Sequence, residues 1–139
     1  MAYPNSPEHY DVVVTSNMFG DIATDLASVL QGGMGMAGSG NIGDEHAFFE
    51  PVHGSAPKYA GMNKVNPIAS VNSIQMMMDW LGRKDGNAEI LEIAKAIEQS
   101  VSAHLSEGKH LTYDLGGNAS CSMVGDLIAQ RLAKSLSER

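Results

Sequence analysis

The sequence predicts an α/β fold, and three observations support that class. Residues 10–15 contain three successive valines at 12–14, a short β-branched run typical of a buried strand. Residues 87–106 repeat apolar side chains at helical spacing and end at Gly108, as an amphipathic helix does. A chain of 139 residues, 43% of them hydrophobic and 18% charged, can also enclose one modest core.

The first half of the chain is expected to connect two structural units. We predict a turn at 17–20 after the strand, and then a helix over 21–30 that ends at Gly32 and Gly33. The segment 31–44 is so rich in glycine that we expect no regular element there, which makes it the predicted crossing between the units. Two short elements are predicted next: a strand at 47–50 and a structured loop at 52–64.

The second half of the chain is predicted to be mainly helical. Asn66 and Pro67 suit the N-cap and first position of a helix that runs to residue 81, and Gly82 would end it. The predicted helix at 87–106 follows. Three further elements are expected: a short strand at 111–115, a turn at 116–120 and a last helix at 122–136. Four large apolar residues of the first of these helices are expected in the core: Met76, Met77, Met78 and Trp80.

Composition narrows the range of partners and compartments. The net charge of −7 would repel nucleic acid and anionic lipid, so we expect neither as a partner. The single cysteine, Cys121, excludes an internal disulfide and a cysteine-based zinc site, and it favours a reducing compartment. The first ten residues are polar, and no apolar run reaches about 18 residues. We therefore expect a cytoplasmic protein.

Two aspartates are spaced for a divalent metal. Asp21 and Asp25 are four residues apart, so on a helix they share a face, where two like charges cost roughly 0.2–0.5 kcal/mol. A Mg²⁺ or Mn²⁺ ion would reverse this repulsion, because both ions prefer oxygen ligands. From spacing alone, one capping and one solvent-facing aspartate is the commoner interpretation.

A glycine motif at 33–38 matches the pattern G-x-G-x-x-G of dinucleotide-binding folds. That pattern acts only between a strand and a helix, because the pyrophosphate lies at the N-terminus of the helix. Here a predicted helix precedes the motif, and more glycine follows at Gly40 and Gly43. We therefore do not assign it this role.

The loop at 50–59 has the residue types of a phosphate and base cradle. His53 could stack on a heterocycle, Gly54 and Ser55 could donate to phosphate, and Lys58 could meet its charge. Taken alone, an ordinary surface loop is the commoner interpretation of such a segment. The four other histidines show no metal-ligand spacing and are interpreted as solvent-facing or locally bonded: His9, His46, His104 and His110.

Several blocks, in order, resemble the β-decarboxylating dehydrogenases, the family of isocitrate and 3-isopropylmalate dehydrogenases. They are Tyr10-Asp11-Val12-Val13-Val14-Thr15-Ser16-Asn17-Met18-Phe19-Gly20-Asp21-Ile22 with Asp25, then Asn41-Ile42-Gly43, Phe49-Glu50-Pro51-Val52-His53-Gly54-Ser55-Ala56-Pro57, Ala60-Gly61 and Val65-Asn66-Pro67. The resemblance implies the carboxy-terminal part of that fold, an incomplete mixed sheet flanked by helices. Residues 1–32 would be the last strand and the metal-binding helix of the substrate and dimerisation domain. Residues 33–139 would be the carboxy-terminal half of the nucleotide-binding domain.

The resemblance also implies the roles of individual residues. Asp21 and Asp25 match the metal ligands of one subunit, for Mg²⁺ or Mn²⁺. A third carboxylate, from the partner subunit of a homodimer, and the catalytic tyrosine and lysine would lie outside this chain. No catalytic residue is therefore expected here, and the chain alone is expected to be inactive. The residues that match the cofactor site are Glu50, His53, Gly54, Ser55, Ala56, Lys58, Tyr59, Val65, Asn66 and Tyr113.

The choice of cofactor is partly indicated by the same resemblance. Lys58, Tyr59 and Tyr113 match residues that hold the 2′-phosphate of NADP in bacterial isocitrate dehydrogenases, whereas NAD enzymes resemble one another in having an acid at the position of Lys58. A lysine favours a phosphate of charge about −1.5 to −2. The match is incomplete, because Gly117 stands where those enzymes have an arginine. NADP is expected, with NAD as the alternative.

The expected activity is oxidative decarboxylation of a small 2-hydroxy-3-carboxy acid. Asn41 to Glu45 and Lys58-Tyr59 with Lys64-Val65-Asn66 resemble isocitrate enzymes. Glu50 to Ser55 and Asp114 to Gly117 resemble isopropylmalate enzymes. Isocitrate is favoured, and 3-isopropylmalate, homoisocitrate or tartrate are alternatives. A different class is also open: a non-catalytic nucleotide-binding or regulatory protein.

Overall fold

The computed structural model describes residues 6–138. Its longer elements are helix α1 (Asn17–Ala27), strands β1 (Gly38–Ile42) and β2 (Ala47–Pro51), and helices α2 (Ile68–Asp85), α3 (Ala88–Glu107) and α4 (Cys121–Ser137). Four short 3₁₀ helices connect them: η1 (Pro7–His9), η2 (Ser28–Gln31), η3 (Pro57–Tyr59) and η4 (Tyr113–Leu115). The predicted α/β class is confirmed, with a two-stranded antiparallel sheet in the described part of the chain.

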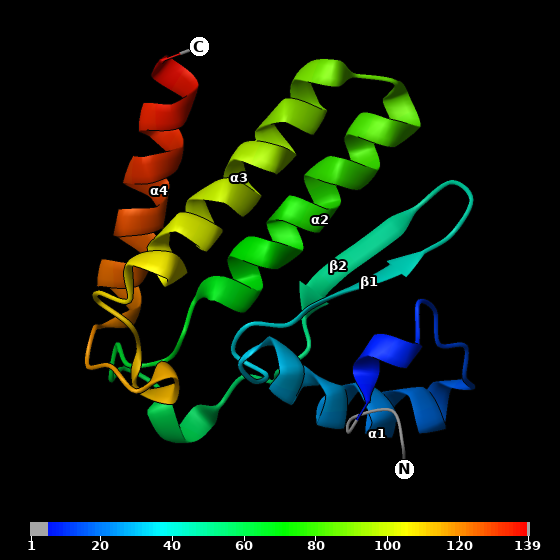
Figure 1. The fold of residues 1–139 in the computed structure, drawn as a ribbon, viewed down its shortest axis with the longest axis horizontal. Helices are drawn as coiled ribbons and strands as arrows, with labels where there is room; N and C mark the ends of the chain where they lie inside the picture. The colour runs from blue at the N-terminus through cyan, green and yellow to red at the C-terminus, as the bar shows by residue number, and fades with distance from the viewer. Residues whose placement is uncertain (1–5, 139) are drawn as a thin grey trace.

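Helices α2, α3 and α4 form the body of the molecule (Figure 1). Helix α3 begins where the Asn87 side chain accepts from the backbone N–H groups of Glu89 and Ile90, at 3.0 and 3.3 Å, and it ends at Gly108 with φ +62°. The core is built from side chains that α2, α3 and α4 turn toward one another, together with two loop residues: Ile68, Val101, Val124, Ile128, Met36 and Ala119. The predicted helices at 87–106 and 122–136 are confirmed.

The β1–β2 hairpin packs against α2 (Figure 1). Its register pairs Gly38 with Pro51 and Ile42 with Ala47. A Cβ on Gly38 would lie 3.2 Å from the backbone nitrogen of Ser73 in α2, so glycine permits this close approach. The prediction that 31–44 has no regular element was therefore wrong, because the glycines serve packing between β1 and α2. The strand predicted at 47–50 is confirmed.

The strand predicted at 10–15 is not formed. The segment has no strand assignment, and the side chains of Val12 and Val14 are 80% and 91% exposed. A strand needs a neighbouring strand for its backbone hydrogen bonds, and the sheet of the described residues consists of β1 and β2. The turn predicted at 17–20 is helix instead, because α1 starts at Asn17 and the Gly20 N–H donates to the Ser16 carbonyl at 2.7 Å.

Three predictions in the second half also need correction. Gly82 does not end α2: it lies inside the helix, where a Cβ would be 2.8 Å from the Leu91 side chain, and Gly86 with φ +63° ends the helix. Segment 111–115 contains the 3₁₀ helix η4 rather than a strand. His104 is buried at 1% exposure, so the solvent-facing alternative predicted for it is wrong, while local bonding remains open.

The methionines of α2 are not core residues. Met76, Met78 and Trp80 are half-buried and Met77 is 37% exposed. Met76 lies against the hairpin, where its Sδ would be 3.1 Å from a Cβ on Gly38. Trp80 packs against Phe49 of β2, with ring centroids 6.2 Å apart. No helix within residues 6–138 is both long and apolar enough to cross a bilayer.

Candidate functional site

A cavity of about 340 Å³ lies where five stretches of chain converge. These stretches are the loop after η2, the loop after β2, η3, the residues just before α2, and η4. The walls contain every predicted cofactor residue except Glu50 and Lys58. The lining residues are Met34, Gly35, His53, Gly54, Ser55, Ala56, Tyr59, Val65, Asn66, Tyr113 and Asp114.

Asn66 fixes the floor of the cavity. Its side chain is buried at 6% exposure, its oxygen accepts from the Ile68 N–H at 3.0 Å, and its amide nitrogen donates to Asp114 Oδ2 at 3.0 Å. The same amide therefore connects the first residue of α2 to η4. The N-cap of α2 is Pro67 and the helix begins at Ile68, so the prediction of Asn66 as N-cap and Pro67 as first helical residue was wrong by one position. Because the oxygen and the nitrogen of the Asn66 amide are both hydrogen-bonded within the protein, Asn66 holds the Tyr113–Asp114 segment in the cavity wall.

Gly35 explains why the glycine motif at 33–38 matters even though it is not a dinucleotide fingerprint. A Cβ at Gly35 would lie 2.8 Å from Asp114 Oδ2 and 3.1 Å from the Cβ of Asn66. Glycine therefore lets this loop close against the Asn66–Asp114 pair. Three lining residues were not predicted: Met34, Gly35 and Asp114. The glycine spacing was the available signal for Gly35, but the tertiary contact that explains it is invisible in sequence.

The loop from His53 to Ala56 forms the open side of the cavity. Gly54, Ser55 and Ala56 are exposed, and a Cβ on Gly54 would meet nothing within 4 Å. Ala56 holds a left-handed conformation with φ +44°, which an L-residue adopts at a cost of roughly 1–2 kcal/mol. His53 Nδ1 lies 2.9 Å from the Gly54 carbonyl oxygen. Small side chains thus leave backbone and an imidazole accessible to a bound molecule.

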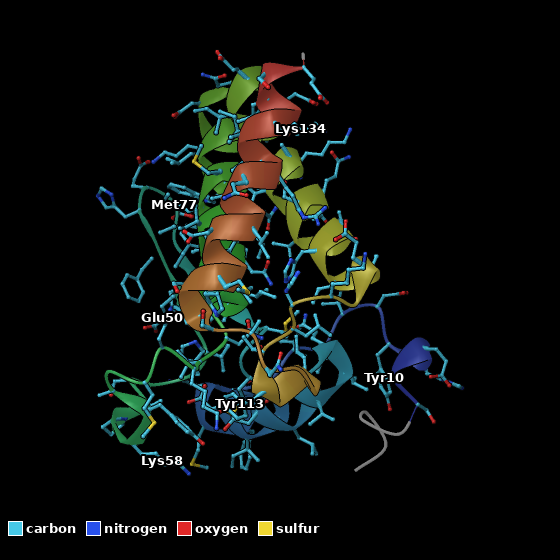
Figure 2. The ribbon with its side chains drawn as sticks, turned by 90° about the vertical axis from the view of Figure 1, so that its left-hand side faces the viewer. Tyr10, Glu50, Lys58, Met77, Tyr113 and Lys134 are labelled. Atoms are coloured by element: carbon cyan, nitrogen blue, oxygen red, sulfur yellow. The ribbon has the colours of Figure 1, made fainter. Side chains whose placement is uncertain are left out.

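Two tyrosines and two lysines form a cationic edge beside the cavity; we call Lys58, Tyr59, Lys64 and Tyr113 the tyrosine–lysine cluster. The two rings are 5.7 Å apart and tilted by 43°. Lys58 Nζ lies 5.0 Å from the Tyr59 ring centroid, and Lys64 Nζ lies 4.5 Å from that of Tyr113. Figure 2 shows Lys58 and Tyr113 at the same end of the molecule, away from Lys134.

Electrostatics within the cluster distinguish the two phenols. A hydrogen bond with Tyr113, followed by one with Lys58, lowers the pKa of Tyr59 below its usual value. The bond with Tyr59, followed by desolvation, raises the pKa of Tyr113. The two tyrosines therefore differ in pKa although their rings are neighbours, and the Lys58 side chain contributes to the lower pKa of Tyr59.

Comparison with known proteins identifies the family. A model described as isocitrate/isopropylmalate dehydrogenase matches residues 1–128. The chain belongs to the isocitrate/isopropylmalate dehydrogenase family. It is 48% identical over 130 residues to homoisocitrate dehydrogenase of Methanocaldococcus jannaschii, and 44% identical over 137 residues to 3-isopropylmalate dehydrogenase of Thermobifida fusca. These matches cover 94% and 96% of this chain but only 35% and 36% of the relatives, so the chain spans about a third of their length.

A solved structure of the same isocitrate/isopropylmalate dehydrogenase family supports the fold. The isocitrate dehydrogenase of Methylococcus capsulatus superposes with a TM-score of 0.82 at 35% identity. The superposition covers 94% of this chain and 37% of that one. The resemblance to β-decarboxylating dehydrogenases is therefore confirmed at the level of family and fold.

The two candidate metal ligands of the chain, Asp21 and Asp25, lie on α1. Asp21 and Asp25 are exposed and one helical turn apart, on the same face. Their oxygens suit Mg²⁺ or Mn²⁺, but two carboxylates fill only part of an octahedral shell. No group of three or more His, Cys, Asp or Glu residues that could hold a metal occurs among residues 6–138. The pair would need further ligands from substrate, water or other protein groups.

Glu50 and Lys58 are the predicted cofactor residues that the structure places outside the cavity wall. Glu50 lies in β2, opposite Ser39 of β1, and its side chain is exposed. Lys58 is exposed on η3 and reaches the site only through the Tyr59 ring. Glu50 could therefore contact only a ligand that extends beyond the cavity toward the hairpin. Lys58, by contrast, lies at the border of the cavity.

Proposed function

We propose that this chain is part of a Mg²⁺- or Mn²⁺-dependent oxidative decarboxylase that acts on a 2-hydroxy-3-carboxy acid with NADP, or NAD, as oxidant. Isocitrate is the favoured substrate, and 3-isopropylmalate or homoisocitrate are the alternatives, as the names of the relatives allow. The observation that carries the proposal is the cavity, because it gathers candidate nucleotide residues from stretches of chain that are far apart in sequence.

The cavity suits a nucleotide in shape and chemistry. His53 can stack on or hydrogen-bond the adenine, and the exposed backbone of Gly54 and Ser55 can donate to phosphate. Lys58 and the tyrosines beside it offer positive charge and hydroxyl donors for a 2′-phosphate. NADP is therefore the proposed cofactor, with NAD as the alternative.

The aspartates of α1 form the second part of the proposed site. Asp21 and Asp25 would hold the metal through two oxygens and leave the remaining positions for substrate and further ligands. A bound divalent ion supplies positive charge that polarises the substrate hydroxyl and stabilises the charge that develops as CO₂ leaves. The catalytic acid and base are proposed to lie in protein outside this chain.

The two parts of the chain are proposed to belong to two domains of the parent enzyme. Residues 1–32 would belong to the substrate and dimerisation domain, and residues 33–139 to the nucleotide-binding domain. Helix α1 exposes large apolar side chains on its surface, including Met18, Phe19 and Ile22 at 64%, 62% and 57% exposure. An apolar surface of this kind is typical of protein interfaces. Further protein is therefore proposed to cover α1, and a homodimer is proposed for the parent enzyme from the resemblance to the family.

Calorimetric titration of the 139-residue chain with NADP and with NAD, in the presence of Mn²⁺ and isocitrate, tests the nucleotide site. We expect binding of NADP without absorbance from NADPH, because the catalytic acid and base are proposed to lie elsewhere. Formation of NADPH would contradict that placement, and absence of any nucleotide binding would refute the site.

A chimera tests the enzyme against the nucleotide-binding alternative. This chain would replace the matching segment of the M. jannaschii homoisocitrate dehydrogenase, to which it is 48% identical. Turnover of homoisocitrate by the chimera would support a catalytic role for the chain. A folded chimera that binds nucleotide but shows no turnover would favour a non-catalytic nucleotide-binding protein instead.

A further inference from the structure

The position at which related NADP enzymes are expected to carry an arginine cannot hold a side chain here. A Cβ on Gly117 would lie 2.0 Å from the carbonyl oxygen of Leu111 and 2.5 Å from its carbonyl carbon. Both are backbone atoms, so no rotation of a side chain can relieve the contact. If the 2′-phosphate site has a second cation, a residue at another position must supply that cation.

Lys64 occupies a suitable place. Its Nζ lies 4.5 Å from the ring centroid of Tyr113 and 5.8 Å from that of Tyr59, so one ammonium group borders both tyrosines. The next residue, Val65, lines the cavity. Within residues 6–138 Lys64 forms no ion pair with a carboxylate, and Asp114 beside Tyr113 already accepts from Asn66.

The backbone that carries Lys64 is held in place by its neighbour Asn63. Asn63 Nδ2 donates to Ser122 Oγ at 2.8 Å, while its side-chain and backbone oxygens accept from the N–H groups of Ser122 and Cys121 at 2.9 and 2.8 Å. Asn63 is also in the left-handed region, with φ +51°, which asparagine tolerates. The start of α4 therefore fixes the point from which Lys64 extends toward the tyrosines.

We propose that Lys64 is the second cation of the 2′-phosphate site and takes the place of the arginine that Gly117 excludes. Together with Lys58 it would determine the preference for a 2′-phosphorylated nucleotide. Two lysines at the edges of a tyrosine pair match a phosphate of charge about −1.5 to −2 better than one lysine does. This inference rests on the proposed nucleotide site and adds a specificity residue to it.

The test compares two probes that differ in the 2′-phosphate. Adenosine 2′,5′-bisphosphate and 5′-AMP would be titrated into the full chain and into Lys64→Gln, Lys64→Arg and Lys84→Gln. Lys84 is the matched control, because its Nζ also lies over an aromatic ring, 4.8 Å from the Trp80 centroid, but Trp80 does not line the cavity as Tyr113 does. Melting curves would confirm that each variant is folded.

We expect Lys64→Gln to weaken the bisphosphate about 10-fold while 5′-AMP changes less than about twofold, as for loss of one charge-assisted hydrogen bond. Lys64→Arg should keep the preference, and Lys84→Gln should change neither affinity. An unchanged ratio of the two affinities in Lys64→Gln would overturn the role of Lys64 while leaving the nucleotide site intact. Failure of the parent chain to bind either probe would overturn both proposals.

Discussion

Replacing Gly117 by alanine should destabilise the fold. Among the loop glycines that do not have a positive φ, we expect the largest loss of stability at this position. The new Cβ would lie 2.0 Å from the Leu111 carbonyl oxygen, far inside van der Waals contact. The two segments are joined at this point by hydrogen bonds from the Gly117 N–H to the Thr112 carbonyl and from the Ala119 N–H to the Leu111 carbonyl, both at 2.9 Å. The methyl can be accommodated only if these segments separate.

The cost follows from the contacts that must change. Overpacking of a well-packed site costs about 1–3 kcal/mol, and weakening of one backbone hydrogen bond adds about 0.5–1.5 kcal/mol. We therefore expect Gly117→Ala to lower the free energy of unfolding by about 2–4 kcal/mol. With a urea m-value of about 2 kcal/mol/M, the midpoint would fall by about 1–2 M.

Urea unfolding followed by circular dichroism measures this change, and Gly125→Ala is the control. Gly125 lies inside α4, where an added Cβ meets nothing within 4 Å. The alanine should therefore raise stability by up to about 1 kcal/mol through helix propensity. If Gly117→Ala and Gly125→Ala had equal midpoints, the close contact at Leu111, and with it the exclusion of an arginine from position 117, would be refuted.

Three further perturbations test separate parts of the site and fold. Lys58→Asp should weaken NADP and strengthen NAD in calorimetry, because an acid repels the 2′-phosphate; unchanged affinities would remove Lys58 from cofactor choice. In the chimera, the double substitution Asp21→Asn and Asp25→Asn should abolish Mn²⁺ binding, measured by the change of the Mn²⁺ electron paramagnetic resonance signal. Retained Mn²⁺ binding would contradict the ligand assignment. Burial lowers the pKa of His104 below about 6.5, so the unfolded chain takes up the proton first and stability falls as pH drops below about 6.5. His104→Gln should flatten that dependence between pH 7.5 and 5.5 in urea unfolding, and an equally steep dependence in the variant would exclude His104 as its source.

The elements that sequence predicted well are those with local signals. Helix α3 carries an apolar stripe between the Asn87 cap and Gly108, and each of these signals lies within the element itself. Strand β1 was missed because its glycines reflect contact with α2, a partner far along the chain. The strand at 10–15 was predicted from valines alone, but strand formation also depends on a neighbour that the described residues do not supply.

The residues of the candidate site likewise fall into those that local motifs predicted and those that depend on tertiary contacts. His53, Gly54, Ser55, Ala56 and the other matched residues were named through motifs, and the cavity brings most of them together. Gly35 and Asp114 were missed because their role depends on contacts with Asn66, which joins three separate segments. Lys64 was named only within an isocitrate-like block, and the role proposed for it depends on the bonds that anchor Asn63 to α4, which the sequence does not reveal.

The most direct test of the nucleotide site is a map of amide chemical shifts during titration of the isotope-labelled chain with NADP. We expect saturable shifts at the cavity wall, at Gly54, Ser55, Asn66 and Tyr113. Shifts confined to the groove between α3 and α4, near Arg131 and Lys134, would place the nucleotide elsewhere and contradict the proposed site.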